Sequence, residues 1–338
     1  MNINELKMLQ ALPLDIKVAK SKLRIKDAID YFGVNGLYIS LSGGKDSTVV
    51  HHLVAEVEME LWGEIRIPRV FCDTGLEYPE LKEHVLELYK TLPEELGIKI
   101  RPEKSFKHVL TNYGYPVLSK SHSFAIRKLT KQNLSERYRN KILWGDERGS
   151  MGRLPEKYHY LQEADFDISE QCCDVMKKKP FKIYEKETNR IPIIGVMADE
   201  SIVRRTRYIQ DGGCNAFNNK RPQSKPIGFW KEQDILQYIF ENKIRIPSIY
   251  GEVIEGINPD GSKSFTLTGV KRTGCMWCIL GSHLEDSENN RFIQMKETHP
   301  KLYNYCINGG QYNELGKWIP SNSGLGLGHV LDALHIKY

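Results

Sequence analysis

The stretch Leu37-Tyr-Ile-Ser-Leu-Ser-Gly-Gly-Lys-Asp-Ser-Thr48 decides how this chain folds. Its first five residues are mostly apolar and predict a buried strand, and residues 42–47 then turn the chain. A helix is predicted next, because apolar residues recur at helical spacing: Val49, Val50, Leu53, Val54, Val57 and Leu61. A strand, a glycine turn and a helix start together form an anion site, since the first helical N–H groups are free and the helix dipole favours negative charge.

The residue types in this turn suit an oxyanion. Gly43 and Gly44 let the backbone approach a ligand without a side chain in the way. Ser42 and Ser47 can add hydroxyl donors, and Lys45 adds a positive charge. A phosphate loop of the Walker type is excluded, because Gly-x4-Gly-Lys-Ser/Thr is absent. The alternative is a serine- and glycine-rich turn that only caps the helix.

Composition indicates a soluble globular protein. The 338 residues are 40% hydrophobic and 27% charged, enough for one large α/β domain with additions or for two domains. No apolar run is long enough to span a membrane, and residues 1–7 lack the apolar core of a secretory signal. We therefore expect a cytoplasmic protein with no membrane contact.

Charge is uneven along the chain. The net charge of +5 is too mild to indicate nucleic acid by itself, but residues 120–159 carry ten Lys or Arg against four Asp or Glu. Tyr138 and Trp144 lie among these cations. Such a stretch can follow a phosphate backbone with aromatic stacking, although an ordinary solvated helix face is the favoured interpretation.

Two further strands are predicted to end beside the first loop. Residues 70–72 form a strand that leads into Asp73-Thr74-Gly75, and residues 190–196 form another that leads toward Arg204 and Arg205. In an open parallel sheet, ligands bind at the carboxyl ends of the strands. Asp73 can bind a ribose hydroxyl or magnesium, Thr74 and Gly75 allow close backbone approach, and the arginines can clamp phosphates. The alternatives are an aspartate that caps its turn, and surface arginines paired with Asp199 and Glu200.

The seven cysteines are grouped in a way that suits metal chemistry in a reducing compartment. Cys172 and Cys173 are adjacent, and after 101 residues they are followed by Cys275-x-x-Cys278. Four thiolates indicate a [4Fe–4S] cluster or a structural zinc. An adjacent pair is easier on a cluster, where the two sulfurs bind different irons. Cys214 can replace one member of the pair, and unligated thiols stay open as an alternative.

In its glycine loop and its cysteines, the chain resembles the phosphoadenosine phosphosulfate (PAPS) reductase family. This family belongs to the adenine nucleotide alpha hydrolase superfamily, also called the N-type ATP pyrophosphatases. The chain is most similar to the cluster-bearing adenylyl sulfate reductases and to the sulfur-transfer proteins of DNA phosphorothioation. The resemblance covers about residues 35–285 and rests on the following residues: Ser42–Ser47, Asp73–Gly75, Cys172-Cys173 with Pro180, Gly195 with Glu200-Ser201 and Arg204, Lys225–Tyr238, and Cys275 with Cys278.

The resemblance implies a doubly wound α/β fold with a mainly parallel sheet and helical additions that bear the cluster. The expected organisation is an N-terminal helical extension (1–30), a nucleotide-binding domain (31–250) and a C-terminal Cys-x-x-Cys region packed on it (251–338). By carry-over, [4Fe–4S] would be bound by Cys172, Cys173, Cys275 and Cys278. The nucleotide would be bound by Ser42, Gly43, Gly44, Lys45, Asp46, Ser47, Asp73, Thr74, Gly75, Gly195, Ser201, Arg204 and Arg205.

Three departures from the family pattern point away from sulfonucleotide reduction. The reductases carry a nucleophilic cysteine in a C-terminal Glu-Cys-Gly-x-His motif, whereas residues 324–329 hold no cysteine and the last one, Cys306, has a different context. Met197 and Ala198 stand where the reductases have an arginine. The Ser-Gly-Gly-Lys-Asp-Ser loop is intact, which is typical of members that cleave ATP to AMP and pyrophosphate.

The expected chemistry is therefore adenylation of an acceptor, with AMP then displaced by sulfur. The expected catalytic residues are Lys45, Asp46 and Arg204, with Mg²⁺ near Asp46 or Asp73. Expected partners are an adenine nucleotide, a nucleic-acid acceptor bound through residues 120–159 or a small-molecule acceptor, a sulfur donor protein, and further copies of the chain. The rivals are a true PAPS or adenylyl sulfate reductase that uses Cys306 or another thiol, and a non-enzymatic DNA-binding regulator that senses nucleotide or redox state.

Overall fold

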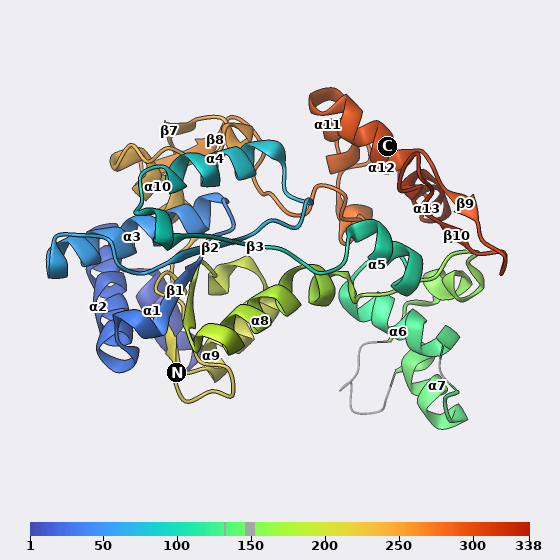
Figure 1. Cartoon of the computed structure of the whole chain (residues 1–338), viewed down its shortest axis with the longest axis horizontal. Coiled ribbons are helices and arrows are strands. Elements are labelled where there is room, and N and C mark those ends of the chain that lie inside the picture. The colour runs from blue at the N-terminus through green and yellow to red at the C-terminus, as the bar shows by residue number, and fades with distance from the viewer. Residues whose placement is uncertain (132, 146–152) are drawn as a thin grey trace. The chain divides into compact units, whose positions relative to one another are not determined.

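The computed structural model, which describes residues 1–131, 133–145 and 153–338, contains a six-stranded sheet (Figure 1). Its strands are β1 (Leu37–Ser40), β2 (Arg69–Cys72), β3 (Gly97–Ile100), β4 (Ile191–Ile194), β5 (Asn215–Ala216) and β6 (Gln223–Ser224). The strand order is β3-β2-β1-β4-β6-β5, and every neighbouring pair is parallel except β5 with β6. This confirms the predicted α/β fold with a mainly parallel sheet.

Thirteen α-helices are present among the described residues. They are α1 (Ile3–Gln10), α2 (Leu14–Phe32), α3 (Lys45–Trp62), α4 (Pro79–Tyr89), α5 (Phe106–Tyr113), α6 (Lys120–Lys131), α7 (Glu136–Trp144), α8 (Lys179–Thr188), α9 (Ile202–Gln210), α10 (Glu232–Glu241), α11 (Arg291–Thr298), α12 (Pro300–Ile307) and α13 (Leu327–Ala333). A π-helical turn, Asp174–Lys178, precedes α8. None of the described helices combines the length and the apolar character needed to cross a bilayer.

Alternating side chains of β1 bury both faces of the sheet. Leu37 and Ile39 are fully buried in the main core, together with the apolar side of α3. Tyr38 points to the opposite face, where it packs against Tyr184 of α8. Successive strand residues face opposite sides of a sheet, so a strand buried on both faces has to be apolar throughout. This explains why residues 37–41 are mostly apolar rather than alternating.

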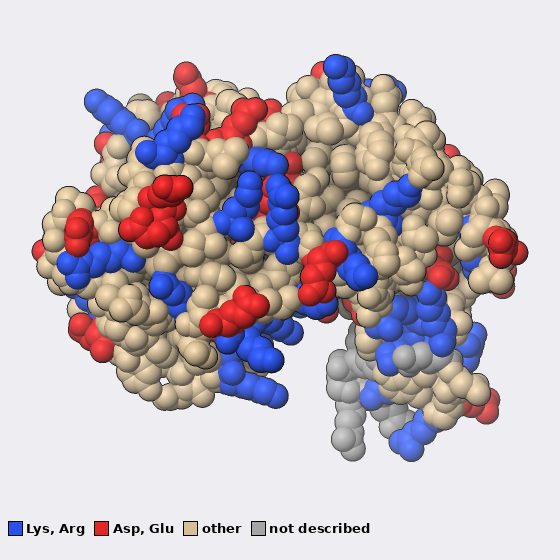
Figure 2. Space-filling view, in the orientation of Figure 1, with Lys and Arg blue, Asp and Glu red and all other residues tan. Residues whose placement is uncertain are grey.

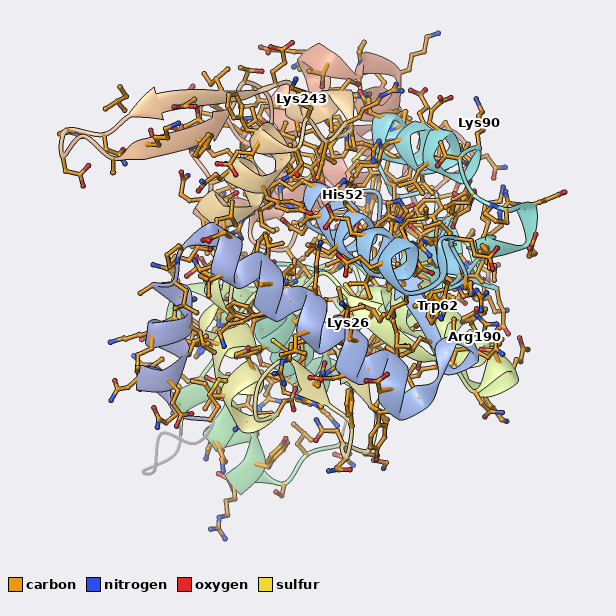
Figure 3. All side chains as sticks on the ribbon, turned by 90° about the vertical axis from the view of Figure 1, so that its left-hand side faces the viewer. Lys26, His52, Trp62, Lys90, Arg190 and Lys243 are labelled. Atoms are coloured by element: carbon orange, nitrogen blue, oxygen red, sulfur yellow. The ribbon has the colours of Figure 1, made fainter. Side chains whose placement is uncertain are left out.

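Helices α2 and α3 lie against each other (Figure 3). Lys26 of α2 forms an ion pair with Glu60 of α3 at 2.9 Å, and Lys22 pairs with the same carboxylate at 3.0 Å. About two turns earlier in α3, His52 Nδ1 lies 2.9 Å from the hydroxyl of Tyr238 in α10. The helix that begins at the glycine loop is thus held along its length by two neighbours.

The chain divides into two compact units that differ from the expected boundaries at residues 30 and 250. The first contains residues 1–73, 77–101 and 181–273, and the second contains residues 74–76, 102–180 and 274–338. Helices α1 and α2 belong to the first unit, where Leu6, Ile25 and Ala28 are fully buried. Hydrophobic periodicity predicts helices and strands but not which of them pack together. It therefore gives no sign that residues 102–180 pack with the C-terminal region.

Two short hairpins and a packed acidic segment complete the described fold. One hairpin is formed by β7 (Val253–Ile257) and β8 (Lys263–Leu267), and the second unit adds the short pair β9 (Gln311–Tyr312) and β10 (Trp318–Ile319). The basic stretch 120–159 contains α6 and α7, while residues 132 and 146–152 lie outside the described residues. The acidic segment 161–171 is packed, because Leu161, Phe166 and Ile168 are buried.

Candidate nucleotide site and four-cysteine site

The glycine loop lies where the order of the sheet reverses. Strand β1 has β2 on one side and β4 on the other, and the loops that follow β1 and β4 open at the same edge. Such a switch point leaves a crevice at the carboxyl ends of the strands. A cavity of about 120 Å³ is lined there by Ser42, Gly44, Lys45, Asp46, Ser47, Gly195, Met197, Glu200, Glu232, Tyr250, Arg272 and Thr273. Its volume suits phosphate groups rather than a whole nucleotide, since small-molecule sites are typically about 300–1,000 Å³.

Two glycines allow the loop and its neighbours to approach closely. Gly43 has φ of +79°, and a Cβ built on it would lie 2.7 Å from the carbonyl oxygen of Leu81 in α4. A Cβ on Gly195 would lie 3.0 Å from the backbone of Asp46. The loop after β4 therefore rests directly on the start of α3, which places both loops in one cavity.

The hydroxyl groups of the loop bond to the loop itself. Ser42 Oγ and Ser47 Oγ are 3.0 Å apart, and Ser47 Oγ donates to the carbonyl oxygen of Gly44 at 2.9 Å. The Thr48 hydroxyl donates to the same carbonyl at 3.1 Å and contacts His84 Nε2 of α4, also at 3.1 Å. Sequence reasoning assigned Ser42 and Ser47 to a ligand, and in the structure they also fix the shape of the turn.

Lys45 is buried among carboxylates. Its side chain is 5% exposed, and its Nζ lies 3.2 Å from Asp46 and 3.5 Å from Glu232. Burial lowers the pKa of Lys45, but Asp46 and Glu232 outweigh burial and the pKa is raised. The pKa of Asp46 is also raised, chiefly by burial, with Lys45 opposing and Glu200 adding to the shift. This balance of charge suits a phosphate that arrives with a divalent cation better than a bare anion.

Six residues of the cavity are absent from the predicted nucleotide site: Met197 and Glu200 after β4, and four from later in the chain. Tyr250 and Thr273 come from either side of the β7–β8 hairpin, and their hydroxyl groups are 2.6 Å apart. Arg272 directly precedes Thr273 and adds a cation, while Glu232 begins α10. The sequence gives one weak signal, because residues 271–273 directly precede the Cys-x-x-Cys motif. Nothing in the sequence indicates that these side chains meet the glycine loop.

Asp73 is already neutralised by protein side chains. It is 7% exposed, and its carboxylate lies 3.1 Å from Lys82 Nζ and 3.3 Å from an Arg101 guanidinium nitrogen. Burial raises the pKa of Asp73, but the two cations outweigh burial and the pKa is lowered. Asp73 does not line the cavity, and neither do Thr74 and Gly75, which belong to the second unit.

The candidate phosphate-binding arginines lie outside the cavity lining. Ser201 caps α9, where its hydroxyl accepts a hydrogen bond from the Arg204 N–H at 3.2 Å. Arg204 forms an ion pair with Glu200, which does line the cavity. The alternative interpretation, an arginine paired with a nearby carboxylate, thus describes Arg204, while Glu200 connects this arginine to the rim of the site.

All four predicted cluster ligands belong to the second unit, and they interact with one another. The pKa of Cys172 is raised by burial and then by the nearby Cys173, Cys275 and Cys278 thiols. Burial raises the pKa of Cys275 to about 11, with Lys177 of the π-helical turn opposing the shift. All are free thiols. Four free thiols are the donor chemistry that soft-metal clusters use.

Local structure explains how these thiols are held. Met276 and Trp277, between the two cysteines of the Cys-x-x-Cys motif, are buried, and the Trp277 ring packs on Phe106. The Met276 N–H donates to the Leu76 carbonyl at 2.8 Å. Cys172 and Cys173 directly precede the π-helical turn, a rare conformation that occurs frequently at functional sites. Within the described residues, no group of three or more His, Cys, Asp or Glu side chains is arranged to hold a single metal ion.

The remaining cysteines are buried elsewhere. Cys214, the predicted substitute ligand, lies in the main core of the first unit, where its sulfur is 3.2 Å from the Tyr208 hydroxyl. Cys306 is fully buried in α12, and burial raises its pKa well above the usual range. A reactive cysteine needs an accessible thiolate, so Cys306 has the properties of a structural residue.

A parallel sheet with a glycine loop and a buried lysine at its switch point is the architecture of an α/β nucleotide-binding protein. One family model identifies the class of nucleotide-binding protein to which the chain belongs. Residues 36–146 and 121–281 match the phosphoadenosine phosphosulfate reductase domain. The chain therefore belongs to the PAPS reductase family, whose namesake enzyme acts on a nucleotide.

Two solved structures are similar at 12% identity. A PAPS reductase from Candida auris, in complex with phosphate, aligns over 73% of this chain and 90% of its own, with a TM-score of 0.36. An FMN adenylyltransferase from Candida glabrata aligns over 76% of this chain and 71% of its own, with a TM-score of 0.41. At these values the likenesses carry no conclusion about what this chain binds. No curated protein matches the sequence significantly.

Proposed function

We propose that this protein binds ATP at residues 42–47 and cleaves it to AMP and pyrophosphate, which activates an acceptor for sulfur transfer. The observation that carries the proposal is the intact loop with buried Lys45, at the switch point of the sheet and in a cavity sized for phosphate groups. An acceptor oxygen attacks the α-phosphorus, the bond to the β-phosphate oxygen breaks, and pyrophosphate leaves. The acceptor's proton passes to solvent.

The charged residues of the cavity have roles in this scheme. The N–H groups at the start of α3 and the Lys45 ammonium stabilise charge on the leaving pyrophosphate. Asp46 would supply a carboxylate for Mg²⁺, with Glu200 and Glu232 as further negative charges in the cavity, and Mg²⁺ would supply charge stabilisation to the phosphates. Arg272 lines the same cavity. Arg204, paired with Glu200, would bind a phosphate of the acceptor or of the nucleotide.

We propose that the four-cysteine site holds a [4Fe–4S] cluster, with zinc as the alternative. Cys172, Cys173, Cys275 and Cys278 would hold it, and Lys177 contributes positive charge beside the thiolates. When bound, a cluster supplies a site that can carry sulfur or electrons. The protein's own part is to bring the four cysteines into one unit, where Cys172 is buried and the other three are partly exposed.

Burial of Cys306 counts against the reductase alternative. Reduction of a sulfonucleotide by the family route needs a thiol that attacks sulfur, and Cys306 is fully buried. The C-terminal residues 324–329 contain no cysteine. The intact loop and the burial of Cys306 therefore favour the same conclusion.

Lys45→Ala tests the proposal. Because the cavity loses its buried cation, pyrophosphate release from Mg·ATP should fall about hundredfold or more. Lys90→Ala is the matched control, since the Lys90 side chain is 71% exposed. Unchanged release in Lys45→Ala would overturn the assignment. Sulfite release from a sulfonucleotide with a thiol reductant, and no pyrophosphate from ATP, would replace it with the reductase.

A further inference from the structure

Cations gather on one side of the second unit. Figure 2 shows Lys and Arg side chains collected over the region of α6 and α7. Residues 120–131 and 133–145 contain seven Lys or Arg and one Glu. We call the exposed members, together with those of the following segment, the basic face: Lys120, Lys131, Arg137, Arg139, Arg153 and Lys157.

Part of the positive charge of this region is neutralised by carboxylates within the fold. Arg127, which is half-buried, forms two hydrogen bonds with Glu170, and Lys131 pairs with Asp167 at 2.6 Å. The acidic segment 161–171 thus neutralises part of the basic stretch. An ordinary solvated helix face would continue this pattern of alternating sign along its length.

The rest of the basic face is not compensated. Within the part of the chain that the structure describes, Lys120, Arg137, Arg153 and Lys157 form no ion pair with a carboxylate. Arg139 donates to the Gln162 side chain and to the Leu129 carbonyl, which leaves its charge unbalanced. Exposed positive charges without carboxylate partners are the electrostatic signature of a polyanion site.

Aromatic side chains are exposed among these cations. Trp144, at the end of α7, is 57% exposed, and an edge-to-face contact with His159 at 5.2 Å holds its ring. Tyr160 is 44% exposed, and its hydroxyl donates to the Ala333 carbonyl. Rigidly held rings exposed beside uncompensated cations are the combination that stacks unpaired bases.

A groove adjoins this surface. Its volume is about 430 Å³, and it lies between α6, α7 and residues 161–168. Leu129, Leu161 and Phe166 give it apolar lining, and Arg139 and Lys317 supply cations. Glu163 and Asp167 also line it, and Asp167 is paired with Lys131. Lys317 Nζ donates to the Ala164 carbonyl rather than to a carboxylate. Apolar lining together with cations matches a base with its phosphate.

We propose that the basic face, with Trp144 and Tyr160 as stacking platforms, binds a single-stranded polynucleotide. This deepens the proposed function and rests on it in one respect: the polynucleotide is the acceptor whose oxygen is adenylated. The phosphodiester backbone is common to DNA and RNA, and the unpaired base supplies the stacking surface. The binding itself requires no ATP, so it can be tested separately from turnover.

Fluorescence anisotropy of labelled oligomers tests the inference with the full chain and no ATP. The probes are oligodeoxythymidylate and oligouridylate of about 20 nucleotides, longer than a typical single-strand site, and a duplex of the same length. Both single strands should bind, and the affinity should fall steeply between about 50 and 200 mM salt. Preference for one single strand over the other identifies the acceptor as DNA or RNA.

Two variants separate the charge from the stacking. The triple variant Lys120→Gln/Arg137→Gln/Lys157→Gln should reduce the slope of log affinity against log salt by about 2, since each single-strand phosphate contact contributes about 0.7. Trp144→Ala should weaken single-strand binding about tenfold and leave duplex binding less affected. These residues are exposed, so circular dichroism should show an unchanged fold.

Matched controls come from the first unit. Lys7→Gln/Lys20→Gln/Lys186→Gln removes three exposed lysines, and Tyr31→Ala removes a ring that is 60% exposed. Neither should change binding. No binding at low salt would overturn the proposal, and so would equal binding by wild type and the triple variant. It would also be overturned if duplex and single strand bound with equal affinity and Trp144→Ala changed neither affinity. Retained binding without pyrophosphate release in the wild type would instead count against the proposed function.

Discussion

Lys45 and Asp73 show how burial decides what a charged residue can do. Both are at the carboxyl edge of the sheet, and both were assigned to ligand binding from sequence. Lys45 lines the cavity, with carboxylates close by on one side. Asp73 already has Lys82 and Arg101, and a buried carboxylate that is fully paired has little reason to accept a ligand. We therefore interpret Asp73 as a residue that fixes the ends of β2 and β3.

Asp73→Asn should lower the stability of the protein at neutral pH. The folded-state pKa of Asp73 is depressed, so its stabilising contribution is present above the unfolded value near 3.9 and is lost as pH falls through the folded value. Because Lys82 and Arg101 are substantially exposed, we expect a loss of only about 1 kcal/mol at pH 7. Urea unfolding of wild type and variant measures it.

The pH dependence distinguishes this role from ligand binding. The stability difference between wild type and Asp73→Asn should shrink toward zero as pH falls through the lowered folded-state pKa of Asp73, because the native carboxyl is then protonated as well. Lys82→Gln should show part of the same effect, because it removes one of the two partners. An Asp73→Asn variant with unchanged stability and a raised KM for ATP would show that Asp73 contacts the ligand instead.

At the scale of elements, α4 determines the shape of the glycine loop on α3. Leu81 and Val85 of α4 contact the Cα side of Gly43, and His84 of the same helix contacts Thr48 in the first turn of α3. Glycine is required at residue 43 for two separate reasons: a positive φ, and the lack of space for a Cβ. The sequence indicates the first reason, but only the position of α4 supplies the second.

Gly43→Ala and Gly33→Ala separate these two reasons. Both glycines have positive φ, +79° and +72°, but a Cβ on Gly33 meets nothing within 4 Å. Gly33→Ala should therefore cost only the backbone strain, about 1–2 kcal/mol. Gly43→Ala should cost about 1–3 kcal/mol more, because the Cβ is 2.7 Å from the Leu81 carbonyl.

Turnover should separate the same pair of variants. Pyrophosphate release should fall only in Gly43→Ala, since that substitution moves α4 and the loop apart, whereas Gly33 precedes β1 and is remote from the cavity lining. Thermal unfolding and pyrophosphate release on the two variants provide the measurement. Equal stability losses in the two would mean that α4 does not restrain the loop.

At the scale of the whole molecule, the second unit is assembled from distant segments of the chain. Residues 102–180 interrupt the sheet between β3 and β4, and they pack with residues 274–338. This pairing brings Cys172 and Cys173 together with Cys275 and Cys278. A metal bound by both segments would link them, so folding of this unit should depend on the metal.

Iron content after anaerobic purification should follow the four ligands. Wild type should hold about four irons and as much labile sulfide per chain. Cys172→Ser and Cys275→Ser should each lose most of the iron, because each removes a thiolate. Cys214→Ala and Cys306→Ala should retain it, since Cys214 is in the core of the first unit and Cys306 is fully buried in α12.

The same preparation distinguishes a cluster from zinc. One zinc per chain with no sulfide, lost in the same two Ser variants, would replace the cluster with a structural site. Full iron in Cys275→Ser would contradict the ligand assignment altogether. A lower unfolding temperature in the Ser variants, but not in Cys306→Ala, would show that the metal holds the two segments together.

The sequence by itself determined the parallel α/β sheet, the glycine loop at the start of α3 and the family. These are local or ordered signals: an apolar run of strand length, glycines before a helix, and cysteines with fixed spacing. The structure confirms the fold class, and the family model confirms the family. The nucleotide and cluster assignments remain predictions, to be tested as described.

Only the tertiary structure decided which side chains surround the loop and which do not. Glu232, Tyr250 and Arg272 enter the cavity from segments about 190 to 230 residues beyond it in the chain, while Asp73 is neutralised by cations of α4 and β3's end. Likewise, the acidic segment 161–171 neutralises part of the basic stretch and leaves the rest uncompensated. The physical reason is that burial and charge pairing depend on distance in space, and a sequence records distance only along the chain.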